Sequence, residues 1–192
     1  SERARALILA LTRLYAPVEV RSWRLIMNLL RKDAPAVRVH WPLKALLADG
    51  TLVEEKVYGG RYLSPAGPAP GGEVAGVRLL APFDPLVWDR IRFAHLYGWE
   101  YKFEAYTPAA KRLRGHYALP LYRDGSVIGW ANVTYRSGSL AVQTGFAHGQ
   151  PRSRAFQAAL DEELDRLRSF LASPEGARAT PPRPAPRSAG AA

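Results

Sequence analysis

The feature that most constrains this chain is a run of proline, glycine and alanine, PAGPAPGGEVAG, at residues 65–76. A segment of this composition with a single charge is typical of a linker, because it favours turns and has no apolar face to bury. Apolar residues recur at helical spacing before this run, whereas strand-like segments follow it. The sequence therefore predicts an α+β chain with two domains, residues 1–64 and 77–172, on either side of the linker.

Residues 1–64 predict three helices followed by a β-hairpin. Leucines three and four positions apart give the first helix an apolar face that ends at Pro17, and a second apolar stripe follows at once. A third helical run, residues 36–48, stops at an Asp-Gly pair. The Gly59-Gly60 turn after it suits two short antiparallel strands. Three helices and a β-hairpin predict a winged-helix domain.

This winged helix offers candidate DNA contacts. In helix-turn-helix folds the last helix before the wing enters the major groove, so Arg38, His40 and Lys44 are the candidate base-reading residues. Arg61, beside the wing tip, is a candidate phosphate or minor-groove contact. Against this interpretation, the basic residues are few and a Trp-Pro pair disturbs the third helix. Winged helices also serve as protein-interaction or structural modules, so both interpretations stay open.

The rest of the chain predicts an antiparallel sheet with two helices and a tail. Five segments rich in aromatic and β-branched residues are separated by turn signals. Apolar spacing predicts one short helix on the sheet and one amphipathic C-terminal helix. Residues 173–192 carry proline, alanine and arginine without periodicity, which predicts a disordered tail. The expected strands are residues 77–83, 99–106, 116–122, 126–136 and 139–146, and the expected helices are residues 86–97 and 152–172.

Charge and composition narrow the class of partner. The chain has 192 residues, with 27 Lys and Arg against 17 Asp and Glu, and its net charge of +10 favours polyanions such as nucleic acid. It has no cysteine, which excludes disulfides, thiolate zinc sites and a cysteine nucleophile. Its four histidines lack the short spacing of a metal site, and no apolar run is long enough for a membrane span. We expect no metal, no cofactor, no membrane partner and a cytoplasmic location.

The densest group of polar and aromatic residues is APFDPLVWDRIRF, residues 81–93. In one interpretation Asp84 and Asp89 cap a helix start and pair with Arg90 or Arg92. In the other, one of these carboxylates is a general base for water. The spacing favours capping, because residues five apart cannot share a helix face well.

A second group is YTPAAKRLRGHYALP, residues 106–120, where basic residues lie among aromatic ones. Cations that hold phosphates and rings that stack on exposed bases are what a nucleic-acid groove uses. In a strand, Lys111 and Arg112 would point to opposite faces, so their cooperation requires a loop or a hairpin tip. The candidate DNA contacts are Lys111, Arg112 and Arg114, with Tyr106, His116 and Tyr117 beside them.

These two groups lie in LLAPFDPLVWDR and FAHLYGWEYKFEAYTPAAKRLRGHYALPL, which closely resemble the signature of the winged-helix crosslink-repair DNA glycosylases of the AlkZ and YcaQ type. The resemblance is specific from Leu79 to Leu121 and looser over the preceding helices and the strands up to Val142. It implies tandem winged helices around a concave face that binds double-stranded DNA. It also implies metal-independent hydrolysis of the N-glycosidic bond of alkylated or crosslinked purines in DNA repair.

The chain departs from that family at two motifs. The family's catalytic Gln-x-Gln or Gln-x-Asp motif is absent, since glutamine occurs only at 143, 150 and 157. The family's Gly-Arg-x-Asp-x-Lys reads Gly-Trp-Ala-Asn-Val-Thr at residues 129–134. The chain is therefore either the C-terminal part of a glycosylase or a shortened relative that kept the scaffold as a noncatalytic DNA-binding or partner-binding module. Asp84, Asp89 and Glu104 are the carboxylates left to orient water, and the residues alone do not select among them.

Overall fold

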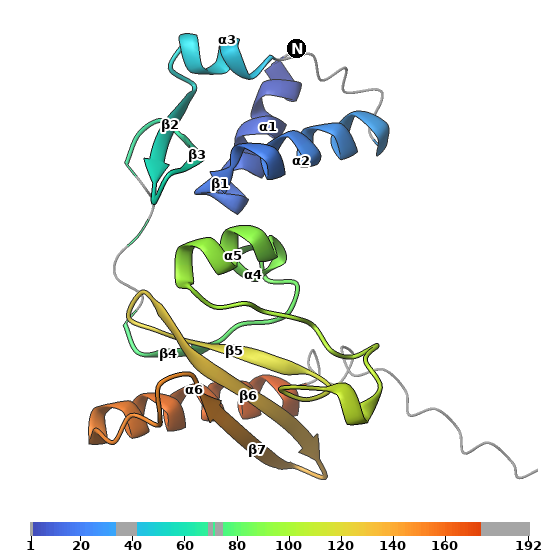
Figure 1. The fold of residues 1–192 in the computed structure, drawn as a ribbon, viewed down its shortest axis with the longest axis vertical. Coiled ribbons are helices and arrows are strands. Elements are labelled where there is room, and N and C mark those ends of the chain that lie inside the picture. The colour runs from blue at the N-terminus through green and yellow to red at the C-terminus, as the bar shows by residue number, and fades with distance from the viewer. Residues whose placement is uncertain (1, 34–41, 69–70, 72–74, 174–192) are drawn as a thin grey trace, which may run out of the picture.

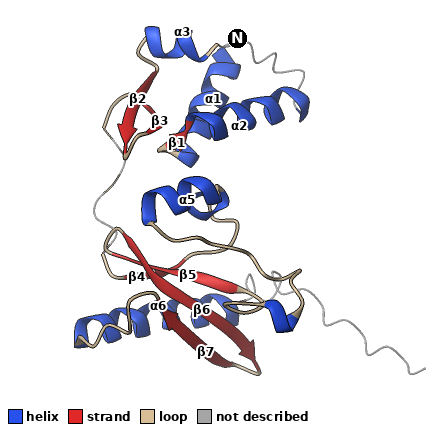
Figure 2. Ribbon diagram, viewed as in Figure 1, coloured by secondary structure: helices blue, strands red, loops and turns tan. Residues whose placement is uncertain are grey.

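The computed structural model describes residues 2–33, 42–68, 71 and 75–173, and Figures 1 and 2 show helices and antiparallel strands in both halves of the chain. The predicted α+β class is confirmed. In the N-terminal half the elements are α1 (Glu2–Tyr15), β1 (Val18–Glu19), α2 (Val20–Asp33), α3 (Leu43–Ala48), β2 (Leu52–Val57) and β3 (Gly60–Pro65). In the C-terminal half they are β4 (Val77–Leu79), α4 (Pro85–Trp88), α5 (Arg90–Tyr97), a 3-10 helix (Ala109–Lys111), β5 (Ala118–Arg123), β6 (Ser126–Arg136), β7 (Ser139–Phe146) and α6 (Arg154–Ala172).

The N-terminal half packs helices against a three-stranded antiparallel sheet of order β1-β3-β2. The two predicted helices before residue 34 and the hairpin are present. The third helix, predicted over residues 36–48, begins only at Leu43, because Pro42 is extended and caps it, and residues 36–41 lie outside the described residues. Buried apolar side chains such as Ile8, Trp23 and Leu63 form one core. The Trp23 indole donates to the Thr12 hydroxyl at 2.9 Å, which satisfies the polar edge of a buried ring.

The C-terminal half is a four-stranded antiparallel sheet of order β4-β5-β6-β7 with helices on both faces. Phe156 and Leu160 of α6 pack on Leu121 and Ala131 of the sheet. A separate cluster on the α5 side includes Phe93, Trp99 and Val127. Over residues 127–131, β6 alternates buried with half-buried side chains, which fits a strand covered on both faces.

Two predicted elements of this half are wrong in detail. Residues 99–106 are not a strand, because Trp99 and Tyr101 turn into the core beside Phe93, and the Tyr101 hydroxyl donates to the Ala118 carbonyl at 3.0 Å. The sheet therefore has four strands rather than about five. The predicted helix 86–97 is two helices, since the extended backbone of Asp89 ends α4 and caps α5.

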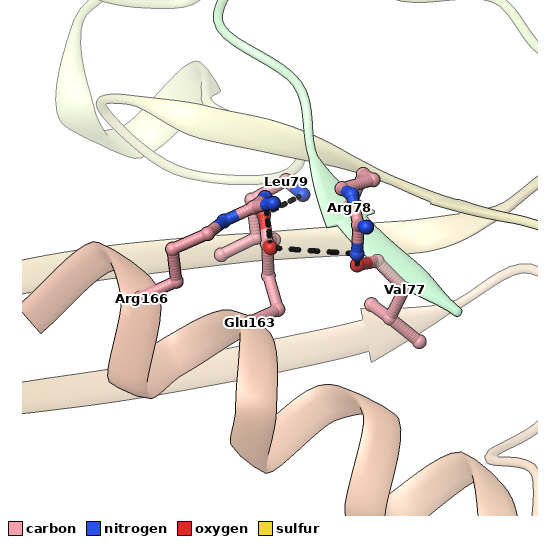
Figure 3. A network of polar contacts seen from close by, with 5 residues as sticks. All are labelled: Val77, Arg78, Leu79, Glu163 and Arg166. Carbon is pink, nitrogen blue, oxygen red and sulfur yellow. Dashed lines mark hydrogen bonds and ion pairs between the residues drawn. The ribbon is translucent and has the colours of Figure 1, made fainter. Parts of the chain in front are cut away.

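Glu163 fastens α6 to the edge of the sheet, as Figure 3 shows. Its side chain is 5% exposed, and Oε1 accepts the Leu79 N–H at 2.8 Å. Oε2 pairs with Arg78 at 3.9 Å and with Arg166 of the next helical turn. No helix within the described ranges is both long and apolar enough to cross a bilayer.

Arg92 of α5 joins the two halves. Its guanidinium is buried and donates to the carbonyls of Tyr15 and Pro17 in the N-terminal half, and to the carbonyls of Pro85 and Leu86 in its own half. Burial lowers the pKa of Arg92 while Asp89 opposes that shift.

The hairpin also contacts α5. The Tyr62 hydroxyl lies 2.5 Å from His95 Nδ1, and the two rings stack at 5.7 Å. A Cβ at Gly60 would lie 2.8 Å from the His95 ring, so any larger residue would have to displace that ring. Contacts with the N-terminal half therefore come from both ends of α5.

Candidate nucleic-acid interface

The most distinctive local structure is the loop between α5 and β5, which is built around a buried carboxylate. Glu104 is 2% exposed, and its oxygens accept the N–H groups of Leu113 at 2.9 and 3.0 Å, Arg114 at 2.8 Å and Gly115 at 3.2 Å. Burial by itself raises the pKa of Glu104, but these N–H groups together lower it below its ordinary value. The carboxylate is thus charged at neutral pH, and it folds residues 105–115 back on themselves.

Arg114 is held between two indole rings at the base of this loop. Its guanidinium lies 4.5 Å from the Trp99 ring centre and 5.7 Å from that of Trp130, which is cation–π geometry. The Asn132 amide donates to the Arg114 carbonyl at 2.5 Å. Trp130 and Asn132 stand where the resembling family carries Arg and Asp. In this chain the side chains at these two positions contact Arg114 and so support the loop.

The three predicted cations of this segment lie together on one irregular loop. Their cooperation requires a loop rather than a strand, and the segment that carries them is a loop with one 3-10 turn. Lys111 ends the 3-10 helix and is exposed, whereas Arg112 is half-buried and its Nε donates to the Thr107 carbonyl at 2.8 Å. Because Arg114 is held by its two rings, Lys111 has the greatest freedom of the three to reach a phosphate.

Of the predicted DNA contacts in the N-terminal half, the structure describes two. Arg38 and His40 lie outside the described residues, and Lys44 is exposed in the first turn of α3. Arg61 is exposed on β3 and forms a two-point pair with Glu54, with Nε and Nη2 each 2.7 Å from a carboxylate oxygen. This pair lowers the pKa of Glu54 and raises that of Arg61. A phosphate at Arg61 would have to compete with Glu54.

The two aspartates of residues 81–93 are helix caps, as the favoured interpretation predicted, but within the described part of the chain neither forms the predicted ion pair with Arg90 or Arg92. Asp84 accepts the Leu86 N–H at 2.8 Å and begins α4, and Asp89 accepts the Arg92 N–H at 3.1 Å and begins α5. Asp89 Oδ2 is buried and has no hydrogen-bond partner among the described residues. Asp84 is half-buried and lines a cavity of about 320 Å³ together with Leu14 and Arg92. Of the three candidate carboxylates, Asp84 is the one next to a space that water could enter.

The sequence did not predict that Trp99 and Trp130 enclose Arg114, or that Glu104 binds the backbone of the loop. The sequence marks Trp130 and Asn132 only as departures from a motif, and Glu104 only as a carboxylate. One residue of β7, Gly145, does indicate in the sequence that Trp130 is packed. A Cβ at Gly145 would lie 2.1 Å from the Trp130 ring, so a glycine opposite a tryptophan marks a packed indole.

Comparison with known families agrees with the resemblance drawn from the motifs. The family model for AlkZ-like DNA glycosylases matches residues 1–170, well over half of the sequence. No solved structure matches the chain. The match runs through both halves, including α1 to β3 and residues 104–115, the loop anchored by Glu104, which we call the anchored loop. The chain therefore belongs to the AlkZ-like family of DNA glycosylases.

Proposed function

We propose that this chain binds double-stranded DNA carrying alkylated or crosslinked purines and acts in the repair of that DNA in the cytoplasm. The observation that carries this proposal is the Glu104-anchored loop, which holds Lys111 and Arg112 at the surface of a family member with a net charge of +10. A loop whose backbone is fixed by its own carboxylate can present cations to phosphates with little further ordering.

The N-terminal elements support a winged helix as the second DNA contact. Their order is α1, β1, α2, α3, β2, β3, and β1 pairs with β3 in a three-stranded sheet, which is the arrangement that a winged helix has. We propose residues 1–64 as this domain, 65–76 as the linker and 77–172 as the second domain. Arg38, His40 and Lys44 are then the proposed major-groove residues, and Arg61 the proposed wing contact.

The proposed reaction is hydrolysis of the N-glycosidic bond at the modified purine. The leaving base is already cationic when N7 is alkylated, so the protein needs mainly to position water and stabilise the developing positive charge on the sugar. All three carboxylates accept a backbone N–H, but Asp89 and Glu104 are buried whereas Asp84 is half-buried. Asp84, which lines the cavity beside Arg92, is the carboxylate that we assign to this water.

A second candidate function is a noncatalytic DNA-binding or partner-binding module. It is favoured by the capping and anchoring roles of all three carboxylates, together with the absence of a Gln-x-Gln or Gln-x-Asp motif from this sequence. Release of free alkylpurine from an N7-alkylated duplex separates the two candidates. Release above the spontaneous rate that is abolished in Asp84→Asn supports the enzyme, and DNA binding without release supports the module.

DNA binding itself is tested by its dependence on salt. For the double variant Lys111→Ala with Arg112→Ala, we expect the slope of log affinity against log salt to fall by about 0.9 for each phosphate that the variant no longer neutralises. The matched control is Arg154→Ala with Arg168→Ala, which removes the same charge from α6 on the opposite face of the sheet. If the two double variants change the slope equally, the loop is not the phosphate-binding site.

A further inference from the structure

Four aromatic side chains gather at the surface beside the anchored loop, and we refer to them as the aromatic cluster. Phe103 is at its centre, with ring centres 5.5 Å from Phe83, 6.2 Å from Tyr106 and 5.2 Å from Tyr117. All three contacts are edge-to-face, at interplanar angles of 63°, 81° and 87°. Residues from the turn before α4, from the loop and from the start of β5 thus meet at one place.

The rings of this cluster are open to solvent. Phe83 is 67% exposed, Tyr106 is 93% exposed and Tyr117 is 45% exposed. Burying a large apolar side chain stabilises a protein, and this chain forgoes more than half of that burial at Phe83 and Tyr106 and nearly half at Tyr117. A contiguous exposed patch of this kind marks a binding surface more often than isolated exposed side chains do.

The backbone on which the rings stand is fixed. Phe83 precedes Asp84, which caps α4, and Phe103 precedes the buried Glu104. Thr107, next to Tyr106, donates its N–H to the Glu104 carbonyl at 3.0 Å. The rings are therefore held apart from the core by ordered turns, which keeps a ready-made surface for a planar ligand.

Positive charge surrounds the aromatic cluster. Residues 101–117 hold four cations, and their one acid, Glu104, is buried against backbone N–H groups. Lys102 directly precedes Phe103 in the chain, and Lys111 and Arg112 lie on the same loop as Tyr106. Cations beside exposed rings complement a phosphate chain that carries planar bases, whereas an apolar protein partner would leave those cations unpaired.

We propose that the aromatic cluster stacks an unpaired nucleobase of DNA, while the neighbouring cations hold the phosphates next to that base. This inference rests on the proposed DNA binding and deepens it, since it assigns a preference for DNA in which one base is out of the helix. Such a base is least costly to unstack where it is mismatched, damaged or opposite a gap. The chain would thereby favour helices already weakened at a lesion.

The test compares two probes with the full chain: a short, fully paired duplex and the same duplex with one unpaired base. We expect wild type to bind the second probe more tightly. In Tyr106→Ala and in Phe83→Ala that advantage should fall by about tenfold per ring, as base stacking on an aromatic side chain predicts, with affinity for the paired duplex unchanged. Tyr106→Phe should keep the advantage, because the ring remains. Phe170→Ala, which removes a half-exposed ring from α6, is the matched control.

Two sets of outcomes would overturn the inference. Cluster variants that lower affinity for both probes equally, or that change neither, would show that the rings do not hold an unpaired base. Cluster variants that abolish self-association in light scattering while the probe preference persists would show that the patch binds protein.

Failure of DNA binding altogether, or an unchanged salt slope in the Lys111 and Arg112 double variant, would instead contradict the proposed function. Circular dichroism melting confirms that each variant folds, and Tyr106 is exposed enough for its removal to leave the fold intact.

Discussion

Glu104 is the single residue on which the anchored loop depends. Replacing it by glutamine keeps the volume but removes the charge and turns one acceptor into a donor facing backbone N–H groups. We expect Glu104→Gln to lower the free energy of unfolding by about 1.5–3 kcal/mol, the range for hydrogen bonds to a charged group. Urea unfolding at neutral pH measures this. Glu100→Gln, at an exposed position four residues earlier, is the control and should be nearly neutral.

The same residue gives the stability of the fold an acid dependence. Because the folded pKa of Glu104 lies below its unfolded value, its contribution is complete above the unfolded pKa, about 4.3, and is lost as pH falls through the folded pKa. The difference in unfolding free energy between wild type and Glu104→Gln should therefore shrink as the pH is lowered below about 4.3. A difference that stays constant down to acid denaturation would contradict the assigned role.

Residues whose roles are local could be predicted from sequence, and residues whose partners are distant could not. Asp84 and Asp89 were predicted as caps because a cap and its N–H lie within three residues of each other. The partners of Glu104 lie nine to eleven residues away, so no local spacing rule points to them. Arg114 was predicted to contact DNA, and its two indole neighbours come from different parts of the fold.

At the scale of elements, periodicity was a good guide where one face is buried and a poor one elsewhere. The helices α1, α2 and α6 and the hairpin were predicted because each has one apolar face. The strand predicted at residues 99–106 rested on aromatic content, which reports burial rather than strand pairing. The break at Asp89 was also missed, because the apolar spacing continues across it.

The attachment of α6 is a prediction at this scale. Glu163 satisfies the Leu79 N–H at the sheet edge and pairs with Arg78 and Arg166 (Figure 3). We expect Glu163→Gln to lower the free energy of unfolding by about 1.5–3 kcal/mol, because the strand N–H and two guanidinium groups lose their charged acceptor. The neighbouring Glu162→Gln, on the exposed face of α6, is the matched control. Equal midpoints of urea unfolding in the two variants would show that apolar packing alone holds α6.

At the scale of the whole molecule, α5 connects the proposed second domain to the proposed winged helix. Arg92 contacts the carbonyls after α1, and His95 contacts the hairpin through Tyr62. Together with Trp88 of α4, which packs on the N-terminal core, these contacts explain how the two halves are held together across the linker. The contact between Arg92 and the Tyr15 carbonyl could not be predicted from the sequence, because the two residues are far apart in the chain and both lie in ordinary helical patterns.

Removal of the Arg92 side chain should uncouple the halves. Arg92→Met keeps an apolar stem of similar length but leaves four carbonyls without their donor and the buried Asp89 without its neighbouring cation. We expect the free energy of unfolding to fall by at least about 1.5–3 kcal/mol, the range for hydrogen bonds to one charged group, because four carbonyls lose that group together. We also expect the single urea transition of wild type to split into two, because each half keeps its own core.

The control is Arg90→Met, the exposed neighbour on α5, which should keep one transition near the wild-type midpoint. If Arg92→Met also unfolds in one transition at that midpoint, ring contacts such as Tyr15 on Trp88, 5.1 Å apart, are sufficient to couple the halves.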